Sequence, residues 1–276
     1  MAHDEQRDLW DPSFFLKSPA FWPLEFFAKH FVDLETWPSL KDFNDFSARN
    51  DEQKALQFVE QNGKQKVLDY IEQIAFSSEV PSRKNNWHDY MNMLCWQAFP
   101  KSRRKINALQ IDALARQPSA ERGVVRSAHL DVLTHLDECG VAVVSSSKAI
   151  LDGIRDFSWK NIFLQYRDVF ATSVDVVIFG HGLYVQCLKP FIGMTGRCLL
   201  LECEAEHFEQ PAYKRLKQTD RLVAQKIGAV RTPQDLSPLP LLGIPGWYAE
   251  NEDMRFYDNR TYFRSGRQKK SSEIAI

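Results

Sequence analysis

The chain has 276 residues, 44% of them hydrophobic, and its 35 lysines and arginines nearly balance its 36 aspartates and glutamates. A chain of this length and composition can bury a substantial core, which excludes an intrinsically disordered protein. The near-zero net charge excludes a global field that would draw the whole surface to nucleic acid or to an acidic membrane. We therefore expect no nucleic-acid partner.

The N-terminus carries Asp4 and Glu5 where a signal peptide would have a basic region followed by an apolar one. The longest uncharged apolar-rich run, residues 176–188, is too short to span a bilayer and contains Gly180 and Gly182. We expect a cytoplasmic protein without a membrane segment. The five cysteines include no Cys-x-x-Cys pair, which favours reduced structural thiols over disulfides or a zinc knot.

The first predicted element is a helix near residues 24–34, because Leu24, Phe27 and Phe31 fall on one helical stripe. It follows an N-terminal arm, residues 1–20, and we expect it to pack on the body of the protein. Helices in globular proteins gain most of their stability from such packing of an apolar face.

A tight turn is the next prediction. Asn62 and Gly63 stand between two apolar segments, a pattern typical of a β-hairpin. Residues 67–75 fit a helix equally well, because their apolar side chains also suit helical spacing. We predict the hairpin and keep the helix as the alternative.

The rest of the chain mixes helices and strands without the regular β-α-β order of a doubly wound sheet. Helices are predicted where apolar residues recur at helical spacing, and strands where short apolar runs occur. The predicted helices are 87–99, 102–116, 126–139, 149–157, 159–170 and 213–227, and the predicted strands are 140–146, 174–180 and 197–203. We therefore predict an α+β fold: one helix-rich domain over residues 1–276, with a small mixed or antiparallel sheet and a flexible basic tail over residues 265–276.

Five sequence phrases stand out together: NNWHDYMNMLCWQAFP, LTHLDECG, FGHGLYVQCLKP, LPLLGIPGWYAEN and FYDNRTYFR. In this combination they resemble a bacterial family known only as a domain of unknown function, family 3025. The similarity extends from about Phe58 to Arg264. The family has no established activity, cofactor or substrate, so the resemblance implies only that these segments belong to one unit.

The first candidate site lies on the helix that begins near Asn86. With Asn86 as N-cap, Asp89 is the third helical residue, where its carboxylate can reach back to the free amide, an explanation that requires no function. His88 and Asn92 lie four residues apart on one helical face, at the edge of an apolar stripe. We interpret His88 as catalytic and Asn92 as substrate-binding. The alternative is a buried histidine bonded to a backbone carbonyl.

Two neighbouring acids form the second candidate. Asp137 lies seven residues after Leu130, on the apolar side of its helix, and Glu138 follows it. A carboxylate there must be partnered or protonated. Both acids also lie in the last helical turn, where the helix dipole disfavours a carboxylate by roughly 0.3–1 kcal/mol. We predict catalytic roles for both. The alternative is an ion pair from Asp137 to an arginine such as Arg126 or Arg155, with Glu138 exposed.

The third candidate is His181, which stands between Gly180 and Gly182 directly after an apolar run. Because a segment of helical character follows, we predict that His181 lies at a strand-to-helix turn. Flanking glycines permit unusual backbone angles or the close approach of another group. Histidine can also exchange a proton near neutral pH, which favours a catalytic role over the alternative of a simple helix cap.

The proline-rich and aromatic segment 238–263 is a candidate lid over a pocket. In this interpretation Trp247 provides a flat wall and Asn251 a hydrogen bond to substrate. The alternative is that the segment only covers the core. The chain contains no dinucleotide-binding fingerprint, phosphate-binding loop or serine-hydrolase motif in a convincing setting.

A basic run places lysines and arginines on the first turns of the helix over residues 102–116. It lacks interleaved aromatic residues, so we interpret it as a solvated face and not as a nucleic-acid site. The residues of this run are Lys101, Arg103, Arg104 and Lys105.

Three hypotheses for the function follow. The first is an enzyme that uses His181, Asp137, Glu138 and His88 for acid-base chemistry on a small polar substrate, with hydrolysis as the least specific reaction of this kind. In the second, the same groups hold a divalent metal ion that activates water. Their sequence spacing does not demand a metal, so the first ranks ahead. The third is a binding or scaffolding protein in which these residues are buried structural groups.

Overall fold

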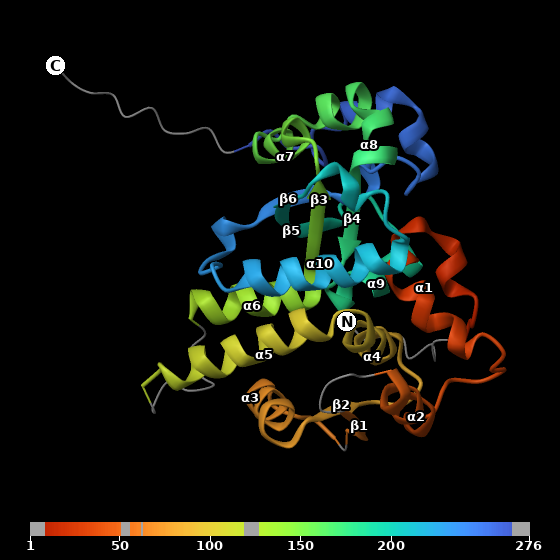
Figure 1. Cartoon of the computed structure of the whole chain (residues 1–276), viewed down its shortest axis with the longest axis vertical. Helices are drawn as coiled ribbons and strands as arrows, with labels where there is room; N and C mark the ends of the chain where they lie inside the picture. The colour runs from red at the N-terminus through yellow and green to blue at the C-terminus, as the bar shows by residue number, and fades with distance from the viewer. Residues whose placement is uncertain (1–8, 51–55, 62, 119–126, 267–276) are drawn as a thin grey trace.

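The computed structural model describes residues 9–50, 56–61, 63–118 and 127–266 (Figure 1). These residues form a helix-rich α+β fold with a small mixed sheet, as the sequence predicts. The helices are α1 (Trp22–Ala28), α2 (Leu40–Asn50), α3 (Val67–Glu72), α4 (Trp87–Ala98), α5 (Pro100–Ala115), α6 (Ala128–Cys139), α7 (Lys148–Arg155), α8 (Arg167–Ser173), α9 (His181–Leu188) and α10 (Ala212–Ile227). The strands are β1 (Gln57–Glu60), β2 (Glu79–Ser82), β3 (Gly140–Ser145), β4 (Val174–Ile178), β5 (Thr195–Glu202) and β6 (Ser237–Pro240).

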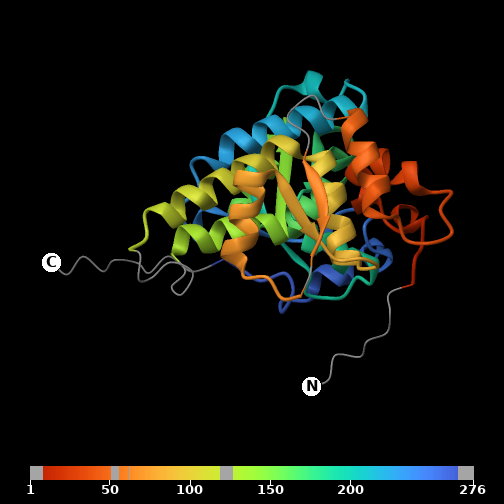
Figure 2. The same cartoon turned by 90° about the horizontal axis from the view of Figure 1, so that it is seen from below.

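The main sheet has the strand order β4-β3-β5-β6, in which β3 pairs antiparallel with β4 and parallel with β5. Every residue of β3 and of β4 is buried, which explains why both strands are mostly apolar in the sequence; Asp175 of β4 is paired with Arg215. Helix α10 crosses in front of this sheet, with α5 and α6 beside it (Figure 1). The second sheet, β1 with β2, lies below the main sheet in the view of Figure 1, near α3 and α4, and it faces the viewer in Figure 2.

The register between β3 and β4 brings two distant segments together. Val141 near the start of β3 pairs with Ile178 at the end of β4. Because the strands run in opposite directions, the end of α6, which precedes β3, meets the start of α9, which follows β4. The backbone amide of Gly180 donates to the carbonyl of Gly140 at 3.0 Å, which continues this contact beyond the strands.

The glycines around His181 are required by close approach. A Cβ atom on Gly180 would lie 2.3 Å from the amide nitrogen of Gly140 and 2.6 Å from that of Cys139. A Cβ atom on Gly182 would lie 2.4 Å from a carboxylate oxygen of Glu138. Of the two reasons that the sequence offered for these glycines, the structure therefore supports the close approach of another group.

The predicted hairpin at Asn62 and Gly63 is wrong. Strands β1 and β2 are parallel, and α3 together with the π-helical turn η4 (Gln73–Ser77) joins them, so the helical alternative for this segment is confirmed. Parallel strands need such a crossover connection. Helix α3 is stabilised by tertiary packing, because Ile71 is buried in a small cluster with Leu114 of α5.

Two other predicted helices are divided. The helix expected over residues 24–34 is α1 followed by a short 3₁₀ turn that ends at Phe31, and Leu24, Phe27 and Phe31 are buried as predicted. The helix expected over residues 159–170 is a π-helical turn, η5 (Asn161–Gln165), followed by α8. The remaining predicted helices and strands agree with the structure to within two residues at most of their ends.

The main hydrophobic core is one cluster of contacting side chains, whose members come from all along the chain between Phe14 and Phe263. The described part of the predicted N-terminal arm therefore contributes to the core, because Phe14 is fully buried. Most of the predicted basic tail, residues 267–276, lies outside the described residues. That the whole chain is one domain stays a prediction.

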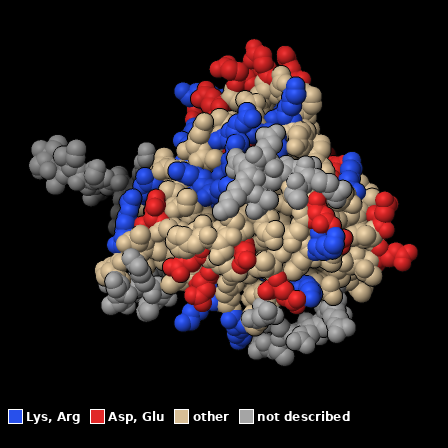
Figure 3. Space-filling view, turned by 60° about the horizontal axis from the view of Figure 1, so that its bottom comes forward, with Lys and Arg blue, Asp and Glu red and all other residues tan. Residues whose placement is uncertain are grey.

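Three further sequence expectations concern thiols, membranes and charge. All five cysteines are free, and Cys95, Cys187 and Cys198 are buried, in agreement with structural thiols. Among the described residues, none of the helices has the length and apolar character needed to cross a bilayer. On the face shown in Figure 3, lysines and arginines are interspersed with aspartates and glutamates.

We expect Gly180→Ala to lower the free energy of unfolding by about 2–3 kcal/mol or more, because the new methyl group would overlap backbone atoms that cannot move independently. Urea unfolding monitored by circular dichroism would measure this change. The matched control is Gly228→Ala, where the nearest atom to the added Cβ is at 3.4 Å and the backbone is helical. Equal stability of the two variants would contradict the proposed close approach.

Candidate functional site

A cavity of about 430 Å³ lies between the segment around α3 and β2 on one side and helices α4, α5, α6 and α9 on the other. Its walls combine apolar side chains with a group of polar and charged ones, as is typical of small-molecule sites. The predicted site residues that line it are His88, Asn92, Asp137, Glu138 and His181.

A larger hollow of about 790 Å³ runs along α10. It includes His207, but both ring nitrogens of this histidine already have partners. They lie 3.1 Å from Oε1 of Gln218 and 3.1 Å from Oδ2 of Asp175. This histidine is therefore held as a structural group, and the smaller cavity is the better candidate site.

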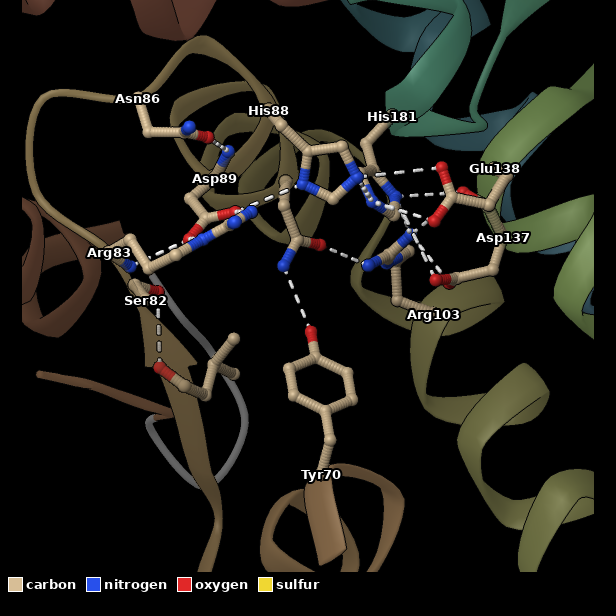
Figure 4. Close-up of polar contacts among 12 residues, drawn as sticks. Tyr70, Ser82, Arg83, Asn86, His88, Asp89, Arg103, Asp137, Glu138 and His181 are labelled. Atoms are coloured by element: carbon tan, nitrogen blue, oxygen red, sulfur yellow. Dashed lines mark hydrogen bonds and ion pairs between the residues drawn. The ribbon is translucent and has the colours of Figure 1, made fainter. Parts of the chain in front are cut away.

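Two histidines and one glutamate converge at the wall of the smaller cavity (Figure 4). The Nε2 atoms of His88 and His181 are 3.1 Å apart. Glu138 places Oε1 3.5 Å from Nε2 of His181 and Oε2 3.6 Å from Nε2 of His88. One ligand atom from each of the three residues lies within 4.8 Å of the others, an arrangement that could hold a metal ion.

The ring nitrogen Nδ1 of His88 is hydrogen-bonded to a carboxylate. Nδ1 of His88 donates to Oδ1 of Asp89 at 2.9 Å. Asp89 is held in turn by Arg83, whose backbone amide donates to it at 2.6 Å and whose guanidinium forms two further bonds. Asn86 caps α4 as predicted. The carboxylate of Asp89, however, binds Arg83 and His88 and not the amide of Asn86, so Asp89 supports the site in addition to its place in the first helical turn.

The ring nitrogen Nδ1 of His181 is hydrogen-bonded to a backbone carbonyl. Nδ1 of His181 lies 2.9 Å from the carbonyl oxygen of Asp137 and donates to it. This bond places the ring proton on Nδ1 and leaves the lone pair of Nε2 directed at His88. The sequence offered a backbone-bonded histidine as the alternative for His88, and it is His181 that forms this bond.

Arg103 is the site residue that sequence reasoning missed. It is 1% exposed, and its Nη1 lies 2.6 Å from Oδ1 of Asp137. Asp137 therefore forms the ion pair that the sequence offered as its alternative, but with Arg103. Of the two arginines suggested for this pair, Arg155 is paired with Asp152, and Arg126 lies outside the described residues.

The interpretation of the basic run as a solvated face is wrong for Arg103. Helix α5 packs against α4, α6 and α10, and this places Arg103 on the inner stripe of α5. The available signal was its spacing of three residues from the buried Ile106.

Arg103 also organises the neighbouring polar groups. It donates to Oδ1 of Asn92, and its guanidinium lies 5.0 Å from the ring centre of Trp96. Nδ2 of Asn92 donates to the hydroxyl of Tyr70 at 2.9 Å, which ties α3 to the site (Figure 4). Asn92 thus lines the cavity with both ends of its amide already bonded to protein.

The two histidines have opposite electrostatic environments. Hydrogen bonds to Asp89 and Glu138 raise the pKa of His88 to about 9. Burial and the adjacent Arg103 cation lower the pKa of His181 to about 3. At neutral pH the ion-free protein therefore carries a proton on Nε2 of His88. This N–H donates a hydrogen bond to Nε2 of the neutral His181 ring.

The other two predicted substrate-binding residues do not reach the cavity. Neither Trp247 nor Asn251 is among the residues that line it. Asn251 is 1% exposed, and its amide donates to the carbonyls of Leu242 at 2.8 Å and Ile244 at 2.7 Å. The C-terminal segment therefore covers the core around these residues, because its polar groups are used to bond its own backbone.

We expect Arg103→Met to lower the free energy of unfolding by about 3 kcal/mol, because it leaves the Asp137 carboxylate without its cation. Arg155→Met, which breaks an exposed pair, should change it by less than about 1 kcal/mol. Denaturant unfolding of both variants measures the difference. If Asp137→Leu is combined with Arg103→Met, part of the loss should be recovered, and the absence of any recovery would contradict the ion pair.

The opposite environments of the histidines predict a pH dependence. In the ion-free protein, His88 should titrate near pH 9 and His181 should stay neutral across the neutral range, as ¹⁵N NMR of the rings can measure. Because the pKa of His88 is raised from 6.5, its contribution to stability is complete below about pH 6.5 and is lost as the pH rises through about 9. This loss should be smaller in His88→Gln. A titration of His88 near pH 6.5 would contradict the assignment.

Comparisons with known proteins identify the family of the chain. No curated protein and no solved structure matches it. A family model described as protein of unknown function (DUF3025) matches residues 56–267, and this range includes every residue of the converging cluster. The chain therefore belongs to the DUF3025 family of proteins of unknown function.

Proposed function

We propose that the protein is a metal-dependent hydrolase that binds one divalent ion through His88, Glu138 and His181. The observation that carries this proposal is the spacing of 3.1–3.6 Å that relates the two Nε2 atoms and the Glu138 oxygens. Ligand atoms on a tetrahedral zinc ion, at Zn–N distances of about 2.0–2.1 Å, lie about 3.3 Å apart. Each histidine nitrogen lies near this spacing from the other and from one oxygen of Glu138, and one ligand atom of each residue lies within 4.8 Å of the others.

The groups behind the ligands support the same proposal. Histidines that bind a metal usually donate their other ring N–H to a carboxylate or to a backbone carbonyl, which fixes the ring and its tautomer. His88 has the carboxylate of Asp89 in this position, and His181 has the carbonyl of Asp137. Both rings are therefore oriented with Nε2 toward the common centre.

Hydrolysis is the reaction class that this donor set fits best. Two histidines and one carboxylate leave a fourth position for water, as in catalytic zinc sites, and a bound divalent ion brings the pKa of that water close to 7. The three residues line the cavity, so a substrate placed there lies beside the open position. Part of the cavity wall is apolar, formed by the buried side chains of Ile71, Ile74 and Ile106.

Acid-base catalysis without a metal fits the contacts less well. The Asp137 carboxylate is bound to Arg103, and its Oδ2 lies 3.7 Å from Nδ1 of His181, whose proton goes to the backbone. A histidine with a pKa lowered to about 3 is also a poor general base near neutral pH. Both features suit a neutral metal ligand.

We expect the wild-type protein to bind one zinc ion per chain, measured by isothermal titration calorimetry after treatment with a chelator. Replacement of a ligand, as in Glu138→Gln or His181→Asn, should abolish this binding. Asp89→Asn should weaken it by about 10–100-fold, because the carboxylate orients His88. The matched controls are His135→Asn on the exposed side of α6 and Asp152→Asn in an exposed ion pair.

The hydrolytic activity provides the second arm of this test. Hydrolysis of a chromogenic ester panel should require added zinc and should be lost in Glu138→Gln, while the His135→Asn control remains active. Activity that survives complete removal of the ion would instead favour the acid-base mechanism. Unchanged zinc affinity in the ligand variants would overturn the metal site itself.

A further inference from the structure

Apart from the proton on His88, the charged side chains that line the cavity are balanced before an ion is added. Arg83 is paired with Asp89, and Arg103 is paired with Asp137. The third carboxylate is Glu138, and the third cation is Lys66. Once Glu138 binds a divalent ion and both histidines are neutral, the cavity has a net charge of about two positive units, which follows from the proposed metal site.

Lys66 is the cation that is available to a ligand. It directly precedes α3, it is exposed, and it lines the cavity. Among the described residues it makes no ion pair. Arg83 and Arg103, in contrast, are each bound to a carboxylate.

Two buried donors point to the same kind of ligand. Within the part of the chain that the structure describes, Nε of Arg103 and Nε1 of Trp96 have no hydrogen-bond acceptor, although both residues line the cavity and are almost completely buried. A buried N–H without an acceptor costs about 1–3 kcal/mol, so such groups usually meet a ligand or an ordered water molecule. Gln65 has an unpaired buried acceptor, Oε1, which suits a hydroxyl group on the same ligand.

We propose that the substrate of this site is a small phosphate monoester, whose phosphate lies between the metal ion and Lys66. A monoester has a charge of about −1.5 to −2 at neutral pH, which matches the two positive units of the ion-loaded cavity. Its oxygens are acceptors for the Lys66 ammonium group, which lines the cavity. The cavity volume of about 430 Å³ accommodates a metabolite and excludes a folded macromolecule.

The reaction that follows is hydrolysis of the P–O ester bond. The oxygen of water forms a bond to phosphorus, and the bond from phosphorus to the alcohol oxygen breaks. One proton of the water stays on the phosphate, and the other passes to the alcohol oxygen. The products are the free alcohol and inorganic phosphate, so no further co-reactant is required.

The test uses the full chain loaded with zinc, after removal of free metal, and inorganic phosphate as the probe. We expect phosphate to bind in calorimetry and Lys66→Gln to weaken it about fivefold, the upper range for one exposed ion pair. The matched control is Lys64→Gln. It removes the same charge two residues before Lys66, from a side chain that does not line the cavity. Equal phosphate affinity in the two variants would overturn the inference.

Two chromogenic substrates extend this test to catalysis. Hydrolysis of p-nitrophenyl phosphate should show a KM raised about fivefold by Lys66→Gln and unchanged by Lys64→Gln, and the wild-type protein should also hydrolyse neutral p-nitrophenyl acetate. If zinc binds and the acetate is cleaved but phosphate neither binds nor is released from its ester, the phosphate inference fails and the hydrolase proposal stands. If zinc does not bind, the hydrolase proposal fails, and the phosphate inference fails with it.

Discussion

The antiparallel pairing of β3 with β4 is the constraint on which the candidate site depends. It places the end of α6 against the start of α9, so that Glu138 and His181 meet although they are 43 residues apart in the chain. The contact is so close that Gly180 has no room for a side chain, and a side chain on Gly182 would displace the Glu138 carboxylate. His88 joins them from α4, which packs against α9. The site is therefore built on rigid elements and not on loops.

The buried charge of Arg103 is the second organising interaction. It neutralises the Asp137 carboxylate, holds Asn92 and lies beside His181, so one side chain connects α4, α5, α6 and α9. Its positive charge also favours the neutral form of His181. Because Asp89 and Glu138 favour the charged form of His88, the two rings differ in protonation although their Nε2 atoms face each other.

This difference explains how one group of residues can be stable with and without an ion. In the ion-free protein a proton on His88 lies between the two Nε2 atoms and offsets the negative charge of Glu138. A divalent ion would replace this proton at the same centre, so protons and metal compete for the site. The net charge of the cavity then becomes more positive, which connects the metal site to the anionic substrate that we propose.

The sequence by itself determined the α+β class, most of the helices, the strands β3, β4 and β5, and the residues of the cluster one at a time. Local rules were sufficient there. They are the helical spacing of apolar residues, the N-cap at Asn86, and the unfavourable position of two acids in the last turn of α6. Only the tertiary structure decided which residues meet. The parallel pairing of β1 with β2, the burial of Arg103 and the position of Asn251 depend on contacts between distant segments. No periodicity along a single chain records such contacts, because they arise from packing between elements.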